Sequence, residues 1–313
     1  MSDRIVVPAG LAGERTDRIV AVVLGVSRRI ARTTIDDGGV TREGKALSAS
    51  ERLVEGDEID VRLTLEETLV IPDDTVDFGI AYEDDVVAVV DKPPGVVVHP
   101  GAGRTGGTLA NGLLARIPVL EQLGEERRWG IVHRIDRDTS GLLLIAKTPN
   151  AFDDLQAALK ERTITRRYVT LVVGRFSNAT GTIEAPVGRD PGHATRMAVV
   201  AHGRDARTHY RRTADWEQHE LSLLSVRLET GRTHQIRVHM QAIDHPVVGD
   251  PVYGPGRPTA GDPGRTWLHA ASLTFEHPSG SGPMTVHADL PADLAESLRS
   301  LGEPDRGAIP RSA

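Results

Sequence analysis

The apolar run GLLLIA, Gly141 to Ala146, is the feature that most limits how this chain can fold. Its apolar residues follow one another without polar alternation, which is typical of a short strand buried on both faces. The segment HRIDRDTSG, residues 133 to 141, leads into this run and holds two carboxylates, two guanidiniums, an imidazole and two hydroxyls. We therefore expect a dense polar loop at the start of a fully buried strand.

Short strands separated by turns are predicted on either side of this run. In DVVAVVDKPPGVVVHP, a strand over 86–90 is interrupted by a firm turn at 93–95, because proline has no backbone N–H to donate, and resumes over 96–98. Two further strands and an amphipathic helix are predicted at residues 166–174, 220–231 and 149–162. The strands follow one another in hairpins rather than in βαβ units, so the predicted fold class is α+β.

Composition excludes several kinds of chemistry. The chain has no cysteine, which removes disulfides, thiolate nucleophiles and cysteine zinc sites, and suits a reducing compartment. The apolar run that begins at Ile19 is too short to span a bilayer, so we expect a cytoplasmic protein without a membrane partner. The net charge is −7, but thirteen acidic residues and only two basic ones lie between 51 and 90. The remainder is net basic and permits a polyanionic partner.

The first third of the chain predicts a small domain of its own. Residues 16–35 predict two short helices, the first capped by Thr16 and the second by Ser27. Behind them, a hairpin with turns at its glycines is followed by a strand in which Ile59 and Val61 alternate with acidic residues. The outward side of the second helix carries a basic stripe of Arg28, Arg29 and Arg32. The alternative for this stripe is an ordinary solvated helix face.

Residues 14–62 resemble the S4-like, or alpha-L, RNA-binding domain. The resemblance lies in the order of a helix, a basic helix, a turn, a hairpin and the closing segment EGDEIDV. The resemblance implies a small α+β domain that binds RNA through the basic stripe and through Lys45 of the hairpin. Glu43 stands in the hairpin where that family commonly has asparagine. The acidic, proline-containing segment 63–77 is predicted to be a linker.

The segment THQIRVHM, residues 233 to 240, is predicted to be a strand. Alternation in a strand places Arg237 on one face, together with the polar residues Thr233, Gln235 and His239. An arginine on a face between buried strands needs a carboxylate partner, because an unpaired buried charge is costly. The alternative is a surface arginine on a half-exposed strand.

Three other kinds of site are less well supported. The histidines could suggest a metal, but no H-E-x-x-H motif occurs, and structural histidines are favoured. These are His99, His133, His234, His239, His245 and His269. An aspartic protease would need an Asp-Thr-Gly or Asp-Ser-Gly turn, which Ser140 splits here. A Ser140 nucleophile assisted by His133 and Asp138 lacks the G-x-S-x-G elbow.

Four segments together resemble the RluA/RluD-type family of RNA pseudouridine synthases over residues 78–295: DKPPGVVVHP, HRIDRDTSGLLLIAKT, GRTHQIRVHM and HPVVGDPVYG. The resemblance implies a catalytic domain at 78–300 built on a mixed, mostly antiparallel sheet flanked by helices. It also implies no metal or organic cofactor, and isomerisation of uridine to pseudouridine within RNA. Ile135 replaces the leucine that is usual in the HRIDRD motif.

The same resemblance assigns roles to single residues. Asp136 matches the catalytic aspartate, Arg237 the basic residue that pairs with it, and Tyr168 the active-site tyrosine. Tyr168 can stack on the extruded uracil, and its hydroxyl is a candidate for accepting the C5 proton. Asp136 could attack the sugar, attack the base or take a ribose proton. Arg134 is predicted to fill the space that the flipped uridine leaves, and His133 to orient the loop.

The two resemblances together favour large-subunit ribosomal RNA as the substrate, with the stem-loop called helix 69 as one candidate target and transfer RNA as the second kind of substrate. A non-catalytic RNA-binding ribosome assembly factor and an aspartate-dependent hydrolase are the competing classes. We also expect a monomer, and a disordered tail over 301–313.

Overall fold

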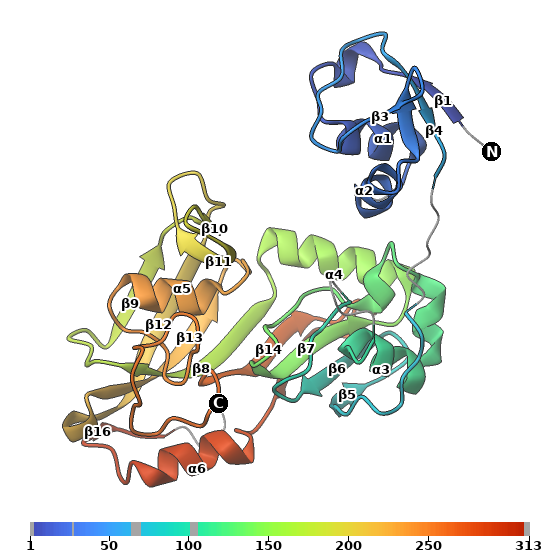
Figure 1. The fold of residues 1–313 in the computed structure, drawn as a ribbon. Coiled ribbons are helices and arrows are strands. Elements are labelled where there is room, and N and C mark those ends of the chain that lie inside the picture. Colours follow the sequence, from blue (N-terminus) through green and yellow to red (C-terminus); the bar gives the residue numbers. More distant parts are fainter. Residues whose placement is uncertain (1–2, 27, 64–69, 101–105, 310–313) are drawn as a thin grey trace. The chain divides into compact units, whose positions relative to one another are not determined.

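The computed structural model describes residues 3–26, 28–63, 70–100 and 106–309. The chain forms two compact units, Met1–Leu69 and Val70–Ala313 (Figure 1). Ser27, the predicted helix cap, lies outside the described residues. The two units are described separately.

The N-terminal unit is a small α+β domain with one four-stranded sheet of order β1-β4-β2-β3. Ile59 and Val61 are fully buried in its core, as the predicted alternation requires. Its order of two helices, a hairpin and a closing strand agrees with the sequence prediction. The elements are β1 (Asp3–Val6), η1 (Ala9–Leu11), α1 (Thr16–Leu24), α2 (Arg28–Asp36), β2 (Val40–Arg42), β3 (Lys45–Ala46) and β4 (Glu58–Val61).

Two details of this unit differ from the prediction. Strand β1 pairs antiparallel with β4, so the unit begins before the predicted start at residue 14. The cap of α1 is Arg15 rather than Thr16, whose hydroxyl donates a hydrogen bond to the Glu51 carbonyl at 3.1 Å. Thr16 therefore joins two segments of the unit instead of closing the helix end.

A ten-stranded sheet forms the frame of the larger unit. Its main path has the order β16-β12-β13-β8-β14-β7-β6-β5, with β15 paired to β14 and β9 paired to β12. All of these pairs are antiparallel except β14 with β7. The strands are β5 (Gly79–Glu83), β6 (Val87–Lys92), β7 (Ser140–Ala146), β8 (Thr165–Val173), β9 (Thr180–Glu184), β12 (Arg207–Trp216), β13 (Leu221–Leu228), β14 (Leu268–Glu276), β15 (Pro283–His287) and β16 (Arg306–Gly307). A separate hairpin joins β10 (Val187–Asp190) to β11 (His193–Val199).

Helices flank this sheet, which confirms the predicted fold class (Figure 1). On β7, Leu143 and Ile145 pack into the main core, whereas Leu142 and Leu144 pack into a second cluster with Phe152 of α4. The strand is therefore buried on both faces, as predicted. The helices are α3 (Leu109–Arg116), η2 (Pro118–Leu123), η3 (Arg128–Gly130), α4 (Pro149–Glu161), η4 (Glu217–His219), α5 (Gln235–Ala242) and α6 (Ala292–Ser300). Within the described part of the chain, no helix has the length and apolar character that a membrane span requires.

The prediction of a strand at residues 233–240 was wrong, because most of this segment forms helix α5. Ile236 and Met240, four residues apart, pack into the main core, and Val238 packs into a separate cluster. The helix is thus buried on more than one side. Over eight residues, such a helix has apolar residues at nearly the same positions as an alternating strand, so periodicity alone does not separate them.

Three predicted boundaries also need correction. Val70 and Phe78 are buried in the core of the larger unit, so the end of the predicted linker at 63–77 belongs to that unit. Leu301 is buried and β16 pairs with β12, so residues 301–309 are not a disordered tail; residues 310–313 lie outside the described part. The segment 96–98 forms an isolated bridge from Val97 to Thr108 rather than a strand.

Candidate active site

Asp136 lies in a short loop that precedes β7, and His133 fastens the first half of this loop. The backbone N–H of Leu144 in β7 donates a hydrogen bond to Nε2 of His133 at 3.1 Å. Burial, with a smaller contribution from Arg166, lowers the pKa of His133 to about 3, so the ring is neutral and Nε2 remains an acceptor near neutral pH. Ile135 is buried in the main core. Both contacts fix the backbone of the loop and thereby the direction in which the side chain of Asp136 points.

The second half of the loop is held by two cations that sequence reasoning did not single out. Lys92 is fully buried and donates hydrogen bonds to the carbonyls of Arg137, at 2.9 Å, and Pro93, at 2.7 Å. Burial lowers the pKa of Lys92 to about 7. Arg265 donates to the carbonyl of Asp138 at 3.1 Å. The backbone after Asp136 is therefore closely tied to the neighbouring segments.

Arg237 links Asp136 to a second carboxylate. Its Nη1 donates to Oδ2 of Asp136 at 3.1 Å, which is the pairing that the family resemblance implied. Its Nε and Nη2 donate to the two carboxylate oxygens of Asp250, at 2.6 and 2.9 Å. The aromatic ring of Tyr253 lies 5.0 Å from the guanidinium carbon. Arg237 thus sits between two acids and against an aromatic ring, with all three nitrogens engaged.

The two carboxylates differ in burial. The side chain of Asp250 is fully buried, whereas that of Asp136 is 21% exposed. Burial alone would raise the pKa of Asp250, but hydrogen bonds and charge from Arg237, with the N–H groups of Tyr253 and Val252, hold it below its ordinary value. Burial alone would lower the pKa of Arg237, but Asp250 and Asp136 raise it. Arg237 stays charged, and Asp136 is the acid that solvent and substrate can reach.

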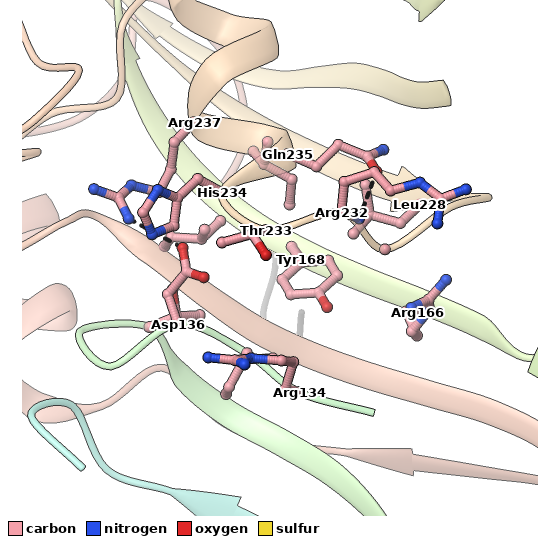
Figure 2. Close-up of a pocket in the computed structure, with 15 residues that line it drawn as sticks. Arg134, Asp136, Arg166, Tyr168, Leu228, Arg232, Thr233, His234, Gln235 and Arg237 are labelled. Carbon is pink, nitrogen blue, oxygen red and sulfur yellow. Dashed lines mark hydrogen bonds and ion pairs between the residues drawn. The ribbon is translucent and has the colours of Figure 1, made fainter. Parts of the chain in front are cut away.

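Asp136 and Arg237 line a pocket together with Tyr168 and Arg134 (Figure 2). Tyr168 is 5% exposed on β8, between β13 and β14. Burial raises the pKa of Tyr168, the Asp136 charge adds to the rise and Arg166 partly opposes it, so the phenol is neutral near neutral pH. Arg134 is exposed and lies at the edge of the pocket.

The turn before α5 supplies another part of the pocket lining. His234 has a left-handed backbone with a φ of 57°, a conformation that is costly for a residue with a side chain. Its Nδ1 lies 2.9 Å from the hydroxyl of Tyr253, and the Thr230 hydroxyl and Arg232 N–H donate to Oε1 of Gln235 at 2.8 and 3.0 Å. These contacts hold the turn in its strained form and aim Arg237 at Asp136.

The other predicted RNA-binding residues lie in the N-terminal unit. Arg28 contacts the buried Asp17 at 3.0 Å, and Arg32 contacts Asp36 at 3.0 Å, but both arginine side chains are more than half exposed. Lys45 is exposed in the hairpin. The side chain of Arg29 lies outside the described part of the structure. Arg28 and Arg32 are therefore accessible on the surface of α2.

Three of the other histidines have hydrogen-bond partners within the fold. His239 contacts the Thr208 hydroxyl and the Ala185 carbonyl, His245 the Val173 carbonyl, and His269 the Ser140 hydroxyl. Among the residues that the structure describes, no group of three or more histidine or acidic side chains could hold a metal ion. These contacts agree with the prediction of hydrogen-bonding histidines.

Comparisons with known proteins define the class. A family model described as RNA pseudouridylate synthase matches residues 86–242. An uncharacterised RNA pseudouridine synthase of Mycobacterium bovis is 42% identical over 96% of this chain and 99% of its own. The ribosomal large subunit pseudouridine synthase D of Nitrosomonas europaea is 41% identical over 95% of this chain and 87% of its own. The chain belongs to this family and is an RNA pseudouridine synthase, an isomerase that acts on RNA.

Relatives with the name of pseudouridine synthase D identify the branch more narrowly as the RluA/RluD type, which was the family that the sequence motifs indicated. A solved structure titled human RNA pseudouridylate synthase domain containing 1 matches with a TM-score of 0.58 and 26% identity, over 77% of this chain and 94% of that one. The frame of the larger unit is thus the frame of this family.

Asp250, Tyr253 and Lys92 were missed by sequence reasoning as parts of the site. All three stand in segments that carried the family resemblance, GDPVYG and DKPPG. The signal that could have found Asp250 was the expectation that Arg237 needs a buried acid. That expectation was satisfied by Asp136, and a second acid was not sought.

Replacing Asp250 with alanine should destabilise the larger unit by about 3 to 5 kcal/mol, because it leaves Arg237 buried with only one of its three hydrogen bonds to carboxylates. The control is Glu296→Ala, which breaks an exposed pair with Arg299 and should cost at most about 1 kcal/mol. Urea unfolding followed by tryptophan fluorescence measures both, since Trp129, Trp216 and Trp267 all lie in this unit. Equal losses of stability for the two variants would show that the contact between Asp250 and Arg237 does not stabilise the larger unit.

Proposed function

We propose that this enzyme isomerises uridines in large-subunit ribosomal RNA and that Asp136 is its catalytic carboxylate. The observation that carries the proposal is a carboxylate that Arg237 fixes at a pocket, beside the buried ring of Tyr168. The substrate is supported by relatives of about this length whose name states the ribosomal large subunit. The helix 69 stem-loop is the specific target that we propose to test first.

The reaction suits the groups in the pocket. Isomerisation breaks the bond from ribose C1' to uracil N1, forms a bond from C1' to C5, and replaces a C5 proton with a proton at N1, so no outside reactant is needed. The sugar becomes electron-poor as the first bond breaks. A carboxylate beside it can attack C1', or take a ribose proton, and both routes require Asp136 to be ionised and directed. Arg237 provides direction through its bond to one oxygen of Asp136.

Tyr168 and Arg134 are assigned to holding the base and the helix. A uridine within a stem-loop must leave the stack, at a cost of a few kcal/mol that protein contacts offset. The ring of Tyr168 can stack on the extruded uracil, and its protonated hydroxyl can bind the base and relay the C5 proton. Arg134, exposed at the edge of the pocket, has a planar guanidinium that can stack in the vacated space.

The N-terminal unit is assigned to RNA binding outside the pocket. Its element order supports an S4-like domain, and its basic helix α2 has exposed arginines. We also propose that the enzyme acts as a monomer. The absence of cysteine supports a location in the cytoplasm.

The substrate is tested by mapping pseudouridines with a chemical adduct and primer stops, on total RNA from cells that lack the protein. After incubation with the purified enzyme, we expect new stops in large-subunit ribosomal RNA, and within helix 69 if the target is as proposed. New stops in transfer RNA alone would move the substrate to that class. No new stop in any RNA would favour the non-catalytic assembly factor.

In the same assay, Asp136→Asn should lower the rate of isomerisation by at least about a thousandfold, because the amide keeps the size of the side chain but loses its charge. RNA affinity should change little. The matched control is Asp153→Asn, an exposed acid of α4 outside the pocket, which should behave as the wild type. Substantial turnover by Asp136→Asn would remove this residue from the reaction.

Combining Arg28→Ala with Arg32→Ala should reduce the salt dependence of RNA binding by about 1.4 to 1.8 in the slope of log K against log salt, since two phosphate contacts are lost. The fold should persist, because Arg15 still pairs with the buried Asp17. The control combines Arg4→Ala with Arg62→Ala, two exposed arginines at the sheet of the same unit. If both pairs give the same slope as the wild type, helix α2 is a plain solvated face.

A further inference from the structure

A second hollow, which we call the basic groove, adjoins the uridine pocket in the larger unit. It has a volume of about 500 Å³ and shares Arg134, Arg166, Gly231 and Arg232 with the pocket as lining residues. The two hollows therefore lie next to each other. A chain whose uridine occupies the pocket can pass through the groove on one side of that uridine.

The lining of the groove has a large excess of positive charge. The lining contains one acidic residue, Glu229, and seven basic residues. The basic residues are Arg128, Arg134, Lys160, Arg162, Arg166, Arg204 and Arg232. That acid is already shared, because Glu229 contacts Arg162, Arg207 and His209 at 3.3, 3.4 and 2.6 Å. Burial and then the nearby charges of Arg204 and Arg162 lower the pKa of Arg232. The free protein therefore holds like charges together at a cost that a polyanion would remove.

Arg166 is the most informative residue of the groove. It is only 7% exposed, yet no carboxylate pairs with it among the described residues, and its Nε is buried without a hydrogen-bond partner. A guanidinium in this state is costly unless an anion binds it. Arg166 is two residues from Tyr168 on strand β8, so both side chains point to the same face. Figure 2 shows Arg166 on the side of Tyr168 away from Asp136.

Gly231 leaves room for this guanidinium. A Cβ at Gly231 would lie 2.6 Å from Nη1 of Arg166, so any side chain there would displace the guanidinium. Gly231 also lines both the pocket and the groove. The absence of a side chain at Gly231 thus lets the Arg166 guanidinium lie where the two hollows meet.

We propose that the basic groove binds the sugar-phosphate backbone of the RNA strand next to the target uridine, and that Arg166 contacts a phosphate at the junction with the pocket. Seven cations in one groove suit a chain of phosphates better than a single anion. The proposal rests on the proposed function only in that the ligand is RNA.

The test measures binding of a fluorescent oligouridylate to the full-length protein. Arg166→Met should weaken binding at least tenfold, and Arg166→Lys should weaken it less, because lysine keeps the charge. Lys160→Ala with Arg204→Ala should reduce the salt slope by about 1.4, as expected for two contacts to a single strand. Arg175→Ala with Arg299→Ala, which removes two exposed cations outside the groove, should leave both quantities unchanged.

Two further measurements separate a phosphate contact from a structural role. Arg166→Met should have a melting temperature no lower than that of the wild type, since an unpaired buried charge is removed. An oligouridylate with neutral methylphosphonates should bind the wild type more weakly, and this difference should shrink for Arg166→Met. A lower melting temperature with unchanged binding would overturn the proposal, as would an undiminished preference for charged phosphates.

Isomerisation by the wild type is measured alongside, so the two proposals can fail separately. If the wild type modifies ribosomal RNA but the groove variants bind the oligonucleotide normally, the groove proposal falls and the proposed function stands. If the groove variants lose binding but the wild type modifies no RNA, the groove is a backbone site and the proposed function falls.

Discussion

The contact between Arg237 and two carboxylates is the interaction on which the rest of the site depends. Asp250 is fully buried and engages two nitrogens of Arg237, which leaves the third for Asp136 at 3.1 Å. Because buried charges must be paired, the position of Arg237 follows from Asp250, and the direction of Asp136 follows from Arg237. The direction of Asp136 is thus set by a partner that does not line the pocket.

Two parts of the fold position the residues of this contact. Strand β7, buried on both faces, holds the loop of Asp136 through Leu144 and His133, and Lys92 and Arg265 hold the backbone that follows. On the other side, a strained turn at His234 begins α5 and presents Arg237. Neighbouring side chains thus bond the backbone carbonyls of the loop and hold it in place. Of the polar residues in this loop, Arg134, Asp136 and Thr139 line the pocket.

The sequence predicted more of the chemistry than of the local structure. The apolar run Gly141 to Ala146 correctly indicated a strand buried on both faces, and the motif pattern correctly paired Asp136 with Arg237. The same reasoning wrongly assigned residues 233–240 to a strand. The helix there is buried on more than one side, and the apolar pattern of so short a segment does not distinguish such a helix from a strand. Asp250 and Arg166 escaped attention because their significance depends on which partner each has, or lacks, in three dimensions.

The most direct test of this account is the single-turnover rate of pseudouridine formation by Arg237→Lys at saturating enzyme. Lysine keeps the charge but cannot bond both oxygens of Asp250 and one of Asp136 in a fixed plane. The account predicts a rate at least about a hundredfold below the wild type, with RNA affinity nearly unchanged. A rate near that of the wild type would show that Asp136 is directed by something other than the shared arginine.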